Sequence, residues 1–255
     1  MLLNHKVLLM SGAGPGLGRT TALLAAARGA SLALLARTSV TLEATAVLAV
    51  ETQALCVTAD VADPQAVRAA VDATLDRFGR IDVLVHSILP PHLLKPVLEL
   101  DEADLPAWRH SLTTSVFGAL TVSRAVAQKM TASSGGAIVF VTATSALQGY
   151  PTVSAHAAGK AGIHALAQCL AAELGPRGIR VNCVAPGVIA GATVQAAFAD
   201  RGQRAAFIAS QDSMNATRRM PTERDVAEAV LFLASDAAAG ITGQIVVVDG
   251  GRFFH

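Results

Sequence analysis

A glycine-rich run near the start of the chain has the residue types and spacing of a phosphate-binding turn. It reads Ser-Gly-Ala-Gly-Pro-Gly-Leu-Gly over residues 11–18. The apolar residues 7–10 before it predict a buried strand, and residues 19–27 after it predict a helix. Glycines let the backbone approach a phosphate closely, and the free N–H groups and positive dipole of a helix start hold its charge. The alternative is an ordinary tight turn between a strand and a helix.

The end of the second predicted strand, residues 31–36, is where a dinucleotide-binding sheet selects its cofactor. An acidic residue there binds the ribose 2′-hydroxyl of NAD, whereas a cationic residue favours the 2′-phosphate of NADP. Arg37 stands at this place, and the first acidic residue after it is Glu43. A guanidinium can bind a phosphate through two hydrogen bonds, so Arg37 predicts a preference for NADP(H). The alternative is a solvated arginine at a strand end.

Asp60 and Val61 are the next candidates for contact with a cofactor. They follow the third predicted strand, residues 54–58, where an adenine ring would lie if the sheet binds a dinucleotide. The Asp60 carboxylate could accept a hydrogen bond from the adenine amino group. It could equally cap its own turn.

The composition fits one large α/β domain and excludes several other classes. The chain has 255 residues, of which 52% are hydrophobic, so it can bury a sizeable core. Its formal net charge of +1 gives no reason to expect nucleic acid or a membrane surface as a partner. No apolar stretch reaches about 18 residues without a charge or a helix breaker, so no membrane span is expected. A strand begins within six residues of the N-terminus, so no signal peptide is expected either.

The cysteines and histidines do not form a metal-binding pattern. Cys56, Cys169 and Cys183 are an odd, widely spaced set, which fits buried thiols in a reducing cytoplasm better than a disulfide framework. His92 and His110 belong to no cluster of His, Cys, Asp and Glu with ligand spacing. We therefore expect a cytoplasmic protein that holds no metal.

Strands alternate with helices along the whole chain. Apolar runs predict seven strands, at residues 7–10, 31–36, 54–58, 81–85, 136–142, 179–185 and 244–248. Helices are expected around 42–49, over 63–78, in two pieces over about 101–133, and over about 154–174 and 223–235. Residues 187–221 are expected to be irregular or weakly helical. The pattern predicts an α/β fold, a single Rossmann domain over 1–255 whose doubly wound seven-stranded parallel sheet has helices on both faces.

Several motifs together resemble the short-chain dehydrogenase/reductase family from one end of the chain to the other. They are the run at 11–18, Asp60-Val61, Asn182 with Pro186-Gly187, and the stretches 225–227, 241–244 and 249–251. The resemblance implies a nicotinamide cofactor, a small-molecule substrate and a mobile substrate lid at 187–221. It also implies a homo-oligomer, a dimer or a tetramer, joined through the helices at about 112–133 and 154–174. The alternative is that these helices pack only inside the monomer.

The resemblance also implies which residues hold the cofactor. They are Gly12, Gly14, Pro15, Gly16, Leu17, Gly18, Arg37, Asp60, Val61, Ser87, Ile88, Lys160, Pro186, Gly187, Ile189 and Thr193. Many members carry a threonine at the position of Gly191, where it holds the nicotinamide amide or a phosphate. Thr193 lies two residues further on and could substitute for it.

The catalytic side chains that the family uses are mostly replaced in this chain. The family has a Tyr-x-x-x-Lys pair at the start of the long helix, a serine thirteen residues before that tyrosine, and an asparagine on the preceding long helix. Lys160 fits the lysine, which would bind the nicotinamide ribose, and His156 stands at the tyrosine position. Ala143 stands for the serine and Ser115 for the asparagine, while the only tyrosine, Tyr150, lies ten residues before the lysine. The four-residue spacing puts the histidine and the lysine on one helix face.

His156 offers an alternative acid–base group, because imidazole donates and accepts protons near neutral pH. A charged Lys160 nearby would favour neutral imidazole. That form is a weak acid for reducing a ketone, but a reasonable base for oxidising an alcohol or activating water. Ala143 removes an oxygen-holding hydroxyl, a donor that can be worth roughly 3–4 kcal/mol of barrier. The hydroxyls that could replace it are those of Thr142, Thr144 and Ser145.

A second departure follows the fourth predicted strand, where the family usually has Asn-Asn-Ala-Gly. This chain has His86-Ser87-Ile88-Leu89, which resembles the enoyl-acyl-carrier-protein reductases, a divergent branch of the family. Those enzymes reduce a carbon–carbon double bond and use a tyrosine seven residues before the lysine, a position that Val153 holds here. Residues 89–98 and the apolar residues of the expected lid favour a lipophilic substrate. The lid residues concerned are Phe198, Phe207, Ile208 and Met214.

Three functions therefore stay open at the level of the sequence. The first is an NADP(H)-dependent oxidoreductase with His156 as its acid–base group and Lys160 as its cofactor clamp. The second is a non-catalytic nucleotide-binding protein, in which His156 merely fills the space of a tyrosine. The third is a non-redox enzyme that uses the same pocket for proton abstraction or hydration. The cofactor-facing residues that are kept favour the first.

Overall fold

The computed structural model describes residues 2–90, 93–130 and 135–254. One sheet of seven parallel strands runs through the molecule in the order β3-β2-β1-β4-β5-β6-β7. The strands are β1 (Val7–Ser11), β2 (Ser31–Ala36), β3 (Leu55–Thr58), β4 (Val83–His86), β5 (Gly136–Val141), β6 (Ile179–Pro186) and β7 (Ile245–Val248). The strand order reverses between β1 and β4, and ligands of such sheets bind at the carboxyl ends of the strands beside that point. The predicted doubly wound fold is confirmed.

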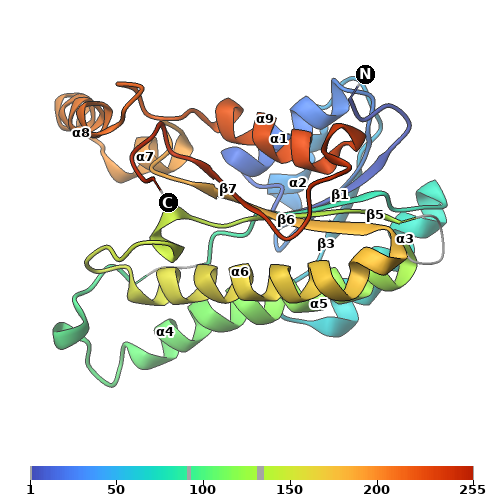
Figure 1. The fold of residues 1–255 in the computed structure, drawn as a ribbon, viewed down its shortest axis with the longest axis horizontal. Coiled ribbons are helices and arrows are strands. Elements are labelled where there is room, and N and C mark those ends of the chain that lie inside the picture. The colour runs from blue at the N-terminus through green and yellow to red at the C-terminus, as the bar shows by residue number, and fades with distance from the viewer. Residues whose placement is uncertain (1, 91–92, 131–134, 255) are drawn as a thin grey trace.

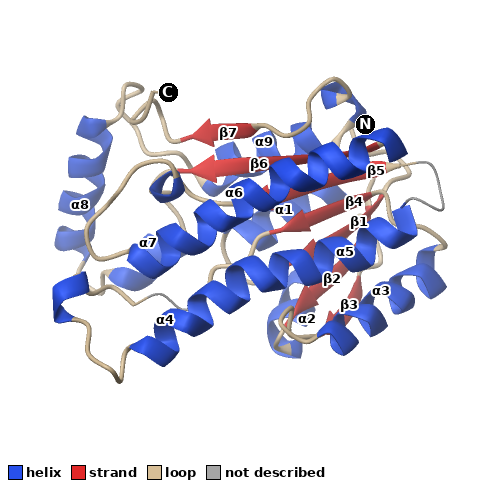
Figure 2. Ribbon diagram, turned by 60° about the horizontal axis from the view of Figure 1, so that its bottom comes forward, coloured by secondary structure: helices blue, strands red, loops and turns tan. Residues whose placement is uncertain are grey.

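Helices cover both faces of the sheet, which explains why the strands are continuous apolar runs. One face carries α1 (Leu17–Ala26), α2 (Ser39–Ala46) and α9 (Glu223–Ala234), and the other carries α3 (Pro64–Phe78), α5 (Gly118–Met130) and α6 (Ser154–Leu174) (Figure 1). Side chains alternate between the faces of each strand, so both sets must be apolar when both faces are covered. The two layers form two separate cores, and α5 and α6 lie side by side along one of them (Figure 2).

The boundaries of three predicted elements are wrong by a few residues. The fourth strand ends at His86 rather than at residue 85, and α2 begins at Ser39 rather than at residue 42. The region predicted as two helices over 101–133 holds α4 (Leu105–Leu112), a π-helical turn (Thr113–Phe117) and α5 (Gly118–Met130). The last part of that prediction, 131–133, lies outside the described residues, as does His92.

The segment 187–221 was expected to be irregular or weakly helical, and the structure bears out its helical part. It contains α7 (Ala192–Ala197) and α8 (Arg201–Met214), which lie beyond the carboxyl ends of the strands (Figure 1). The Asp200 side chain accepts a hydrogen bond from the Gln203 backbone N–H and caps α8. The rings of Phe198 and Phe207 pack with their centroids 4.9 Å apart and join the two helices.

The cysteines differ from the expectation of three buried thiols. Cys183 is buried in β6, and burial raises the pKa of its thiol to about 12. Cys56 is half-buried and Cys169 is exposed, because residue 169 lies on the outward face of α6. Within the described ranges, no group of His, Cys, Asp and Glu has the arrangement of a metal site. None of the helices described is long and apolar enough to cross a membrane.

Candidate functional site

A cleft opens at the carboxyl edge of the sheet, beside the reversal of strand order. Its larger part, a cavity of about 380 Å³, gathers most of the residues that the sequence singled out. These are Gly12, Pro15, Gly16, Leu17, Gly18, Ser87, Ile88, His156, Lys160, Pro186, Gly187, Ile189 and Thr193. A neighbouring hollow of about 270 Å³ adds Gly14, Arg37, Asp60 and Val61. The two parts share Gly12, Pro15, Ser87, Ile88 and Leu89, so they adjoin each other and together are called the cleft below.

The glycine-rich turn lies against the end of β4 and leaves its middle open. Gly12 has a φ of +92°, and a Cβ added to it would lie 2.3 Å from the backbone oxygen of Ser87. A Cβ added to Gly18 would lie 1.9 Å from the backbone oxygen of Gly12. A Cβ on Gly14 would meet nothing within 4 Å. The turn is therefore tightly packed at both ends, while its middle faces the cleft.

This difference predicts opposite effects for two alanine substitutions. Gly12→Ala should destabilise the fold by more than about 2 kcal/mol, because it adds both a strained φ and a backbone clash. Gly14→Ala should change the free energy of unfolding by less than about 0.5 kcal/mol, because its methyl group enters open space. Urea unfolding followed by circular dichroism measures both variants. Equal stability of the two would contradict the packing described for Gly12.

Arg37 and Asp60 stand on either side of the smaller hollow. The Arg37 side chain is exposed just beyond β2, and none of the described carboxylates forms an ion pair with it. The Asp60 carboxylate accepts a hydrogen bond of 2.9 Å from the Ala62 backbone N–H. Asp60 therefore caps its own turn, as in one of the two alternatives, and the role of Arg37 stays a prediction.

Lys160 is the most deeply placed cation of the cleft. Its side chain is 3% exposed, and its Nζ donates to the backbone oxygens of Ile88 and Val141, each at 2.9 Å. Burial lowers the pKa of the Lys160 ammonium to about 8. His156 lies one helical turn earlier, half-buried, and lines the same cavity. The predicted common face of these two residues is confirmed.

The structure does not bring Ser115 into the cleft. This side chain lies in the π-helical turn, is 2% exposed and does not line the cavity. It faces α6 instead, where a Cβ on Gly159 would lie 2.7 Å from the Ser115 Oγ. Ser115 therefore packs against the helix that carries Lys160, and its place among the catalytic groups, at the position of the family's asparagine, stays a prediction.

Thr142 lines the cavity beside Ala143, but its hydroxyl is bonded to other partners. Ala143 itself lines the cavity, whereas the hydroxyl of Thr142 donates to the backbone oxygen of Val184 and lies 2.8 Å from the His164 Nε2. Tyr150 is hydrogen-bonded by Gln148 and lies under the guanidinium of Arg252. Neither Thr144, Ser145 nor Tyr150 is among the lining residues of either hollow.

Two buried histidines near Lys160 were missed at the level of the sequence. His86 is 1% exposed at the end of β4, and burial together with the charge of Lys160 lowers its pKa to about 3. His164 is 7% exposed one turn after Lys160 on α6, and the same two causes lower its pKa to about 4. The available signal was their position, because His164 stands four residues after Lys160 on the predicted helix and His86 directly precedes the cleft residue Ser87.

The outer wall of the cavity is apolar, but it is not made by the expected lid residues. Its apolar members are Leu89, Leu94, Val153, Val188, Ile189 and Val194. The side chains of Phe198, Phe207, Ile208 and Met214 do not line it, because they lie on α8 and in the turn before that helix. The start of the segment 187–221 therefore faces the cleft, and its second half faces away from it.

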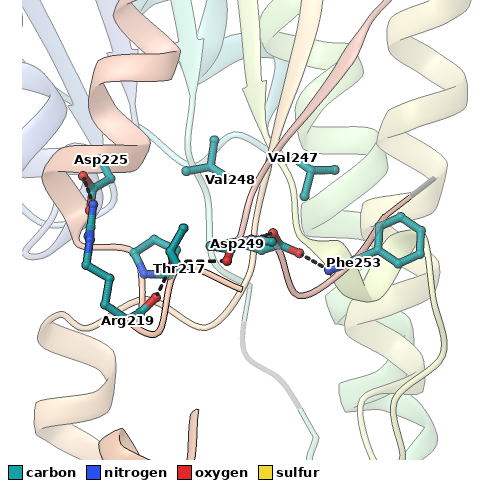
Figure 3. Close-up of a pocket in the computed structure, with 10 residues that line it drawn as sticks. Thr217, Arg219, Asp225, Val247, Val248, Asp249 and Phe253 are labelled. Carbon is teal, nitrogen blue, oxygen red and sulfur yellow. Dashed lines mark hydrogen bonds and ion pairs between the residues drawn. The ribbon is translucent and has the colours of Figure 1, made fainter. Parts of the chain in front are cut away.

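A separate hollow beside β7 contains polar groups that are already paired (Figure 3). The Arg219 guanidinium binds the Asp225 carboxylate at 2.7 and 3.1 Å. The Asp249 carboxylate accepts hydrogen bonds from the backbone N–H groups of Gly251 and Phe253. These contacts hold the C-terminal segment and the start of α9 in place beside the sheet. The polar groups of this hollow therefore stabilise the fold.

The chain is similar to known proteins over nearly its whole length. A family profile described as Enoyl-(Acyl carrier protein) reductase matches residues 12–252. An L-rhamnose 1-dehydrogenase (NAD(P)(+)) from a Sphingomonas species is 34% identical, over 100% of this chain and 98% of its own length. A D-threitol dehydrogenase from Mycolicibacterium smegmatis is 34% identical, over 98% of this chain and 93% of its own length. The crystal structure of levodione reductase superposes with a TM-score of 0.89 at 30% identity, covering 98% of this chain and 97% of the other. The chain belongs to the short-chain dehydrogenase/reductase family of oxidoreductases.

Proposed function

We propose that the protein is an NADP(H)-dependent oxidoreductase that acts on a small, lipophilic alcohol, carbonyl or enoyl substrate, with His156 in place of the usual tyrosine. One observation carries this proposal. The cleft brings together the glycine-rich turn, the exposed Arg37, the buried Lys160 and the half-buried His156. Phosphate-binding and proton-transferring groups therefore face the same space.

The residues of the cleft fit a nicotinamide dinucleotide. The open middle of the glycine-rich turn and the start of α1 offer backbone N–H groups to a diphosphate. Arg37 would hold the 2′-phosphate, and Asp60 and Val61 would lie beside the adenine. Lys160 would hold the nicotinamide ribose, with Pro186, Gly187, Ile189 and Thr193 around the ring. When bound, the nicotinamide supplies or accepts a hydride.

His156 is proposed to move the proton that accompanies hydride transfer. Its imidazole lies at the cavity wall, four residues before Lys160 on the same helix. Imidazole can take a proton from an alcohol or return one to a carbonyl oxygen. The positive charge of Lys160 would stabilise negative charge on the substrate oxygen. A hydroxyl group at residue 143 would do the same, but Ala143 has none.

The lipophilic substrate is proposed from the apolar outer wall. Leu89, Leu94 and Val153 form one side of it, and Val188 and Val194 form the other. The two relatives described above are named for a sugar and a polyol, which such a wall would not favour. The start of the segment 187–221 forms part of this wall, so we propose that this segment is the substrate lid.

We also propose a cytoplasmic homo-oligomer, a dimer or a tetramer, joined through α5 and α6. Two apolar side chains are exposed here: Phe117, the last residue of the π-helical turn before α5, is 44% exposed, and Leu120 in α5 is 39% exposed. Analytical ultracentrifugation tests this proposal, and a monomer at micromolar concentration would contradict it.

The cofactor proposal predicts a clear preference in a fluorescence titration of the purified protein. NADPH should bind with a dissociation constant in the micromolar range and at least about tenfold more tightly than NADH, because a charge-assisted phosphate contact is worth about 1.5–3 kcal/mol. Arg37→Ala should remove this preference by weakening NADPH alone. Arg68→Ala, a change of an exposed arginine on α3, is the matched control and should leave both affinities unchanged.

Either of two results would contradict the cofactor proposal. Equal binding of NADPH and NADH to the unchanged protein would remove the role of Arg37. Binding of neither nucleotide would overturn the oxidoreductase function itself and favour a non-redox use of the cleft.

A further inference from the structure

Glu223 connects the helix that follows the glycine-rich turn to the first helix of the proposed lid. It is the first residue of α9 and is half-buried. Its Oε1 accepts a hydrogen bond of 2.8 Å from the Ala192 backbone N–H, at the start of α7. Its Oε2 accepts a hydrogen bond of 3.0 Å from the hydroxyl of Thr20 on α1. One carboxylate therefore joins α1, α7 and α9.

The carboxylate occupies space that is available only because residue 191 is a glycine. A Cβ added to Gly191 would lie 2.2 Å from the Glu223 Oε1, which is too close for any side chain. A Cβ added to Gly16, in the glycine-rich turn, would lie 3.3 Å from the same oxygen. The absence of a side chain at residue 191 and the presence of this carboxylate are therefore linked. The carboxylate lies directly behind the turn.

The charge of this carboxylate is not balanced by a cation. No lysine or arginine within the described ranges forms an ion pair with Glu223. Its two hydrogen bonds come from neutral groups, an amide and a hydroxyl. A negative charge at this place repels other anions that approach the turn, and partial burial weakens the screening by solvent.

We infer that Glu223 sets the affinity of the cleft for its cofactor, by placing an unpaired negative charge beside the cofactor's diphosphate while holding α7 against α1. This inference rests on the proposed function, because it concerns how the same cleft binds NADP(H). Its consequence is faster release of the cofactor after each reaction, and product release is a common limit on the turnover of enzymes.

The variant Glu223→Gln tests the charge without removing the link. Its amide oxygen can still accept from the Ala192 N–H, and its amide nitrogen can donate to the Thr20 hydroxyl. In a fluorescence titration at low salt, Glu223→Gln should bind NADPH about fivefold more tightly than the unchanged protein, the size expected for two charges several ångströms apart at a partly exposed site. At about 0.5 M NaCl the two affinities should approach each other, because salt screens the repulsion.

Two further variants separate the charge from general effects. Glu228→Gln makes the same change of charge on the same helix, but residue 228 pairs with Arg28 and does not contact the turn, so its NADPH affinity should stay unchanged. Glu223→Ala removes both the charge and the link. Hydrogen exchange of the ligand-free protein should then show faster exchange over residues 191–197, while Glu223→Gln keeps the slow exchange. Thermal unfolding establishes that each variant is folded.

Each outcome has a distinct meaning. Equal or weaker binding of NADPH by Glu223→Gln overturns the inference and leaves the proposed function standing. A gain in affinity that does not decrease with salt overturns it as well, because lid opening and not charge would then be the cause. If neither the unchanged protein nor Glu223→Gln binds NADPH or NADH, the proposed function fails and the inference fails with it.

Discussion

Replacement of His156 by alanine is expected to lower the turnover number of the NADP(H)-linked reaction by at least about 100-fold, while the dissociation constant of NADPH stays within about twofold. The reason is geometric. His156 lines the cavity one turn before Lys160 and is the side chain proposed to transfer the proton, whereas the hydroxyl of Thr142 is directed to Val184. Steady-state kinetics measure the effect on an alcohol, carbonyl or enoyl thioester found by screening.

His156→Tyr is the informative companion to this variant. A phenol at residue 156 restores the Tyr-x-x-x-Lys spacing of the family and reaches further into the cavity than imidazole does. It should recover a measurable part of the activity and move the pH dependence of turnover, since a phenol and an imidazole titrate in different ranges. Unchanged turnover in His156→Ala would remove this residue from the mechanism and favour a nucleotide-binding role or another proton source.

The free energy of unfolding is expected to fall by about 4 kcal/mol between pH 7 and pH 5, because His86 and His164 are buried as neutral groups. Their pKa values in the folded protein are lowered to about 3 and about 4, from 6.5 in the unfolded chain. Below pH 6.5 the unfolded chain therefore binds protons that the folded protein does not, and the unfolded state is favoured as the pH falls. Each histidine contributes about 2 kcal/mol at pH 5. Lys160 stays charged in both states over this range and adds no slope.

Urea unfolding at several pH values measures this loss of stability. The double variant His86→Phe and His164→Gln removes both titrating groups, keeps an aromatic ring against Phe140, and keeps a donor for the Thr142 hydroxyl. Its stability should depend less on pH between 7 and 5 than that of the unchanged protein. His110→Gln, a change of an exposed histidine on α4, is the control. An identical slope in the double variant would show that other groups cause the acid sensitivity.

The sheet and the glycine-rich turn could be predicted because local sequence determines them. Seven apolar runs bounded by helical segments specify a covered parallel sheet, and the glycines of residues 11–18 follow the first of these runs directly. The helix α8 could be expected only as a weak helix without bounds, because none of its residues is buried. Its start was signalled only by the single cap, Asp200.

What the sequence misses within the site are contacts that it does not encode locally. The direction of Ser115 is one of them, because this side chain in the π-helical turn lies against Gly159 of α6. Glu223 could not be found at all, because it bonds Thr20 across 203 residues of sequence. Motifs specify which backbone segments meet, whereas the direction of a side chain depends on the packing between them.

The two hydrogen bonds of Lys160 fix the direction in which its ammonium can donate a third hydrogen bond. An ammonium has three hydrogens in a tetrahedral arrangement, and two of them are held by the backbone oxygens of Ile88 and Val141. The direction of the third N–H bond is therefore fixed by the backbone just after β4 and at the end of β5. It is not set by the flexible methylene chain that carries the ammonium. The backbone at the carboxyl edge of the sheet thus orients the remaining N–H bond of Lys160. A planar guanidinium at residue 160 has a different arrangement of N–H bonds and could not point one of them in the same direction.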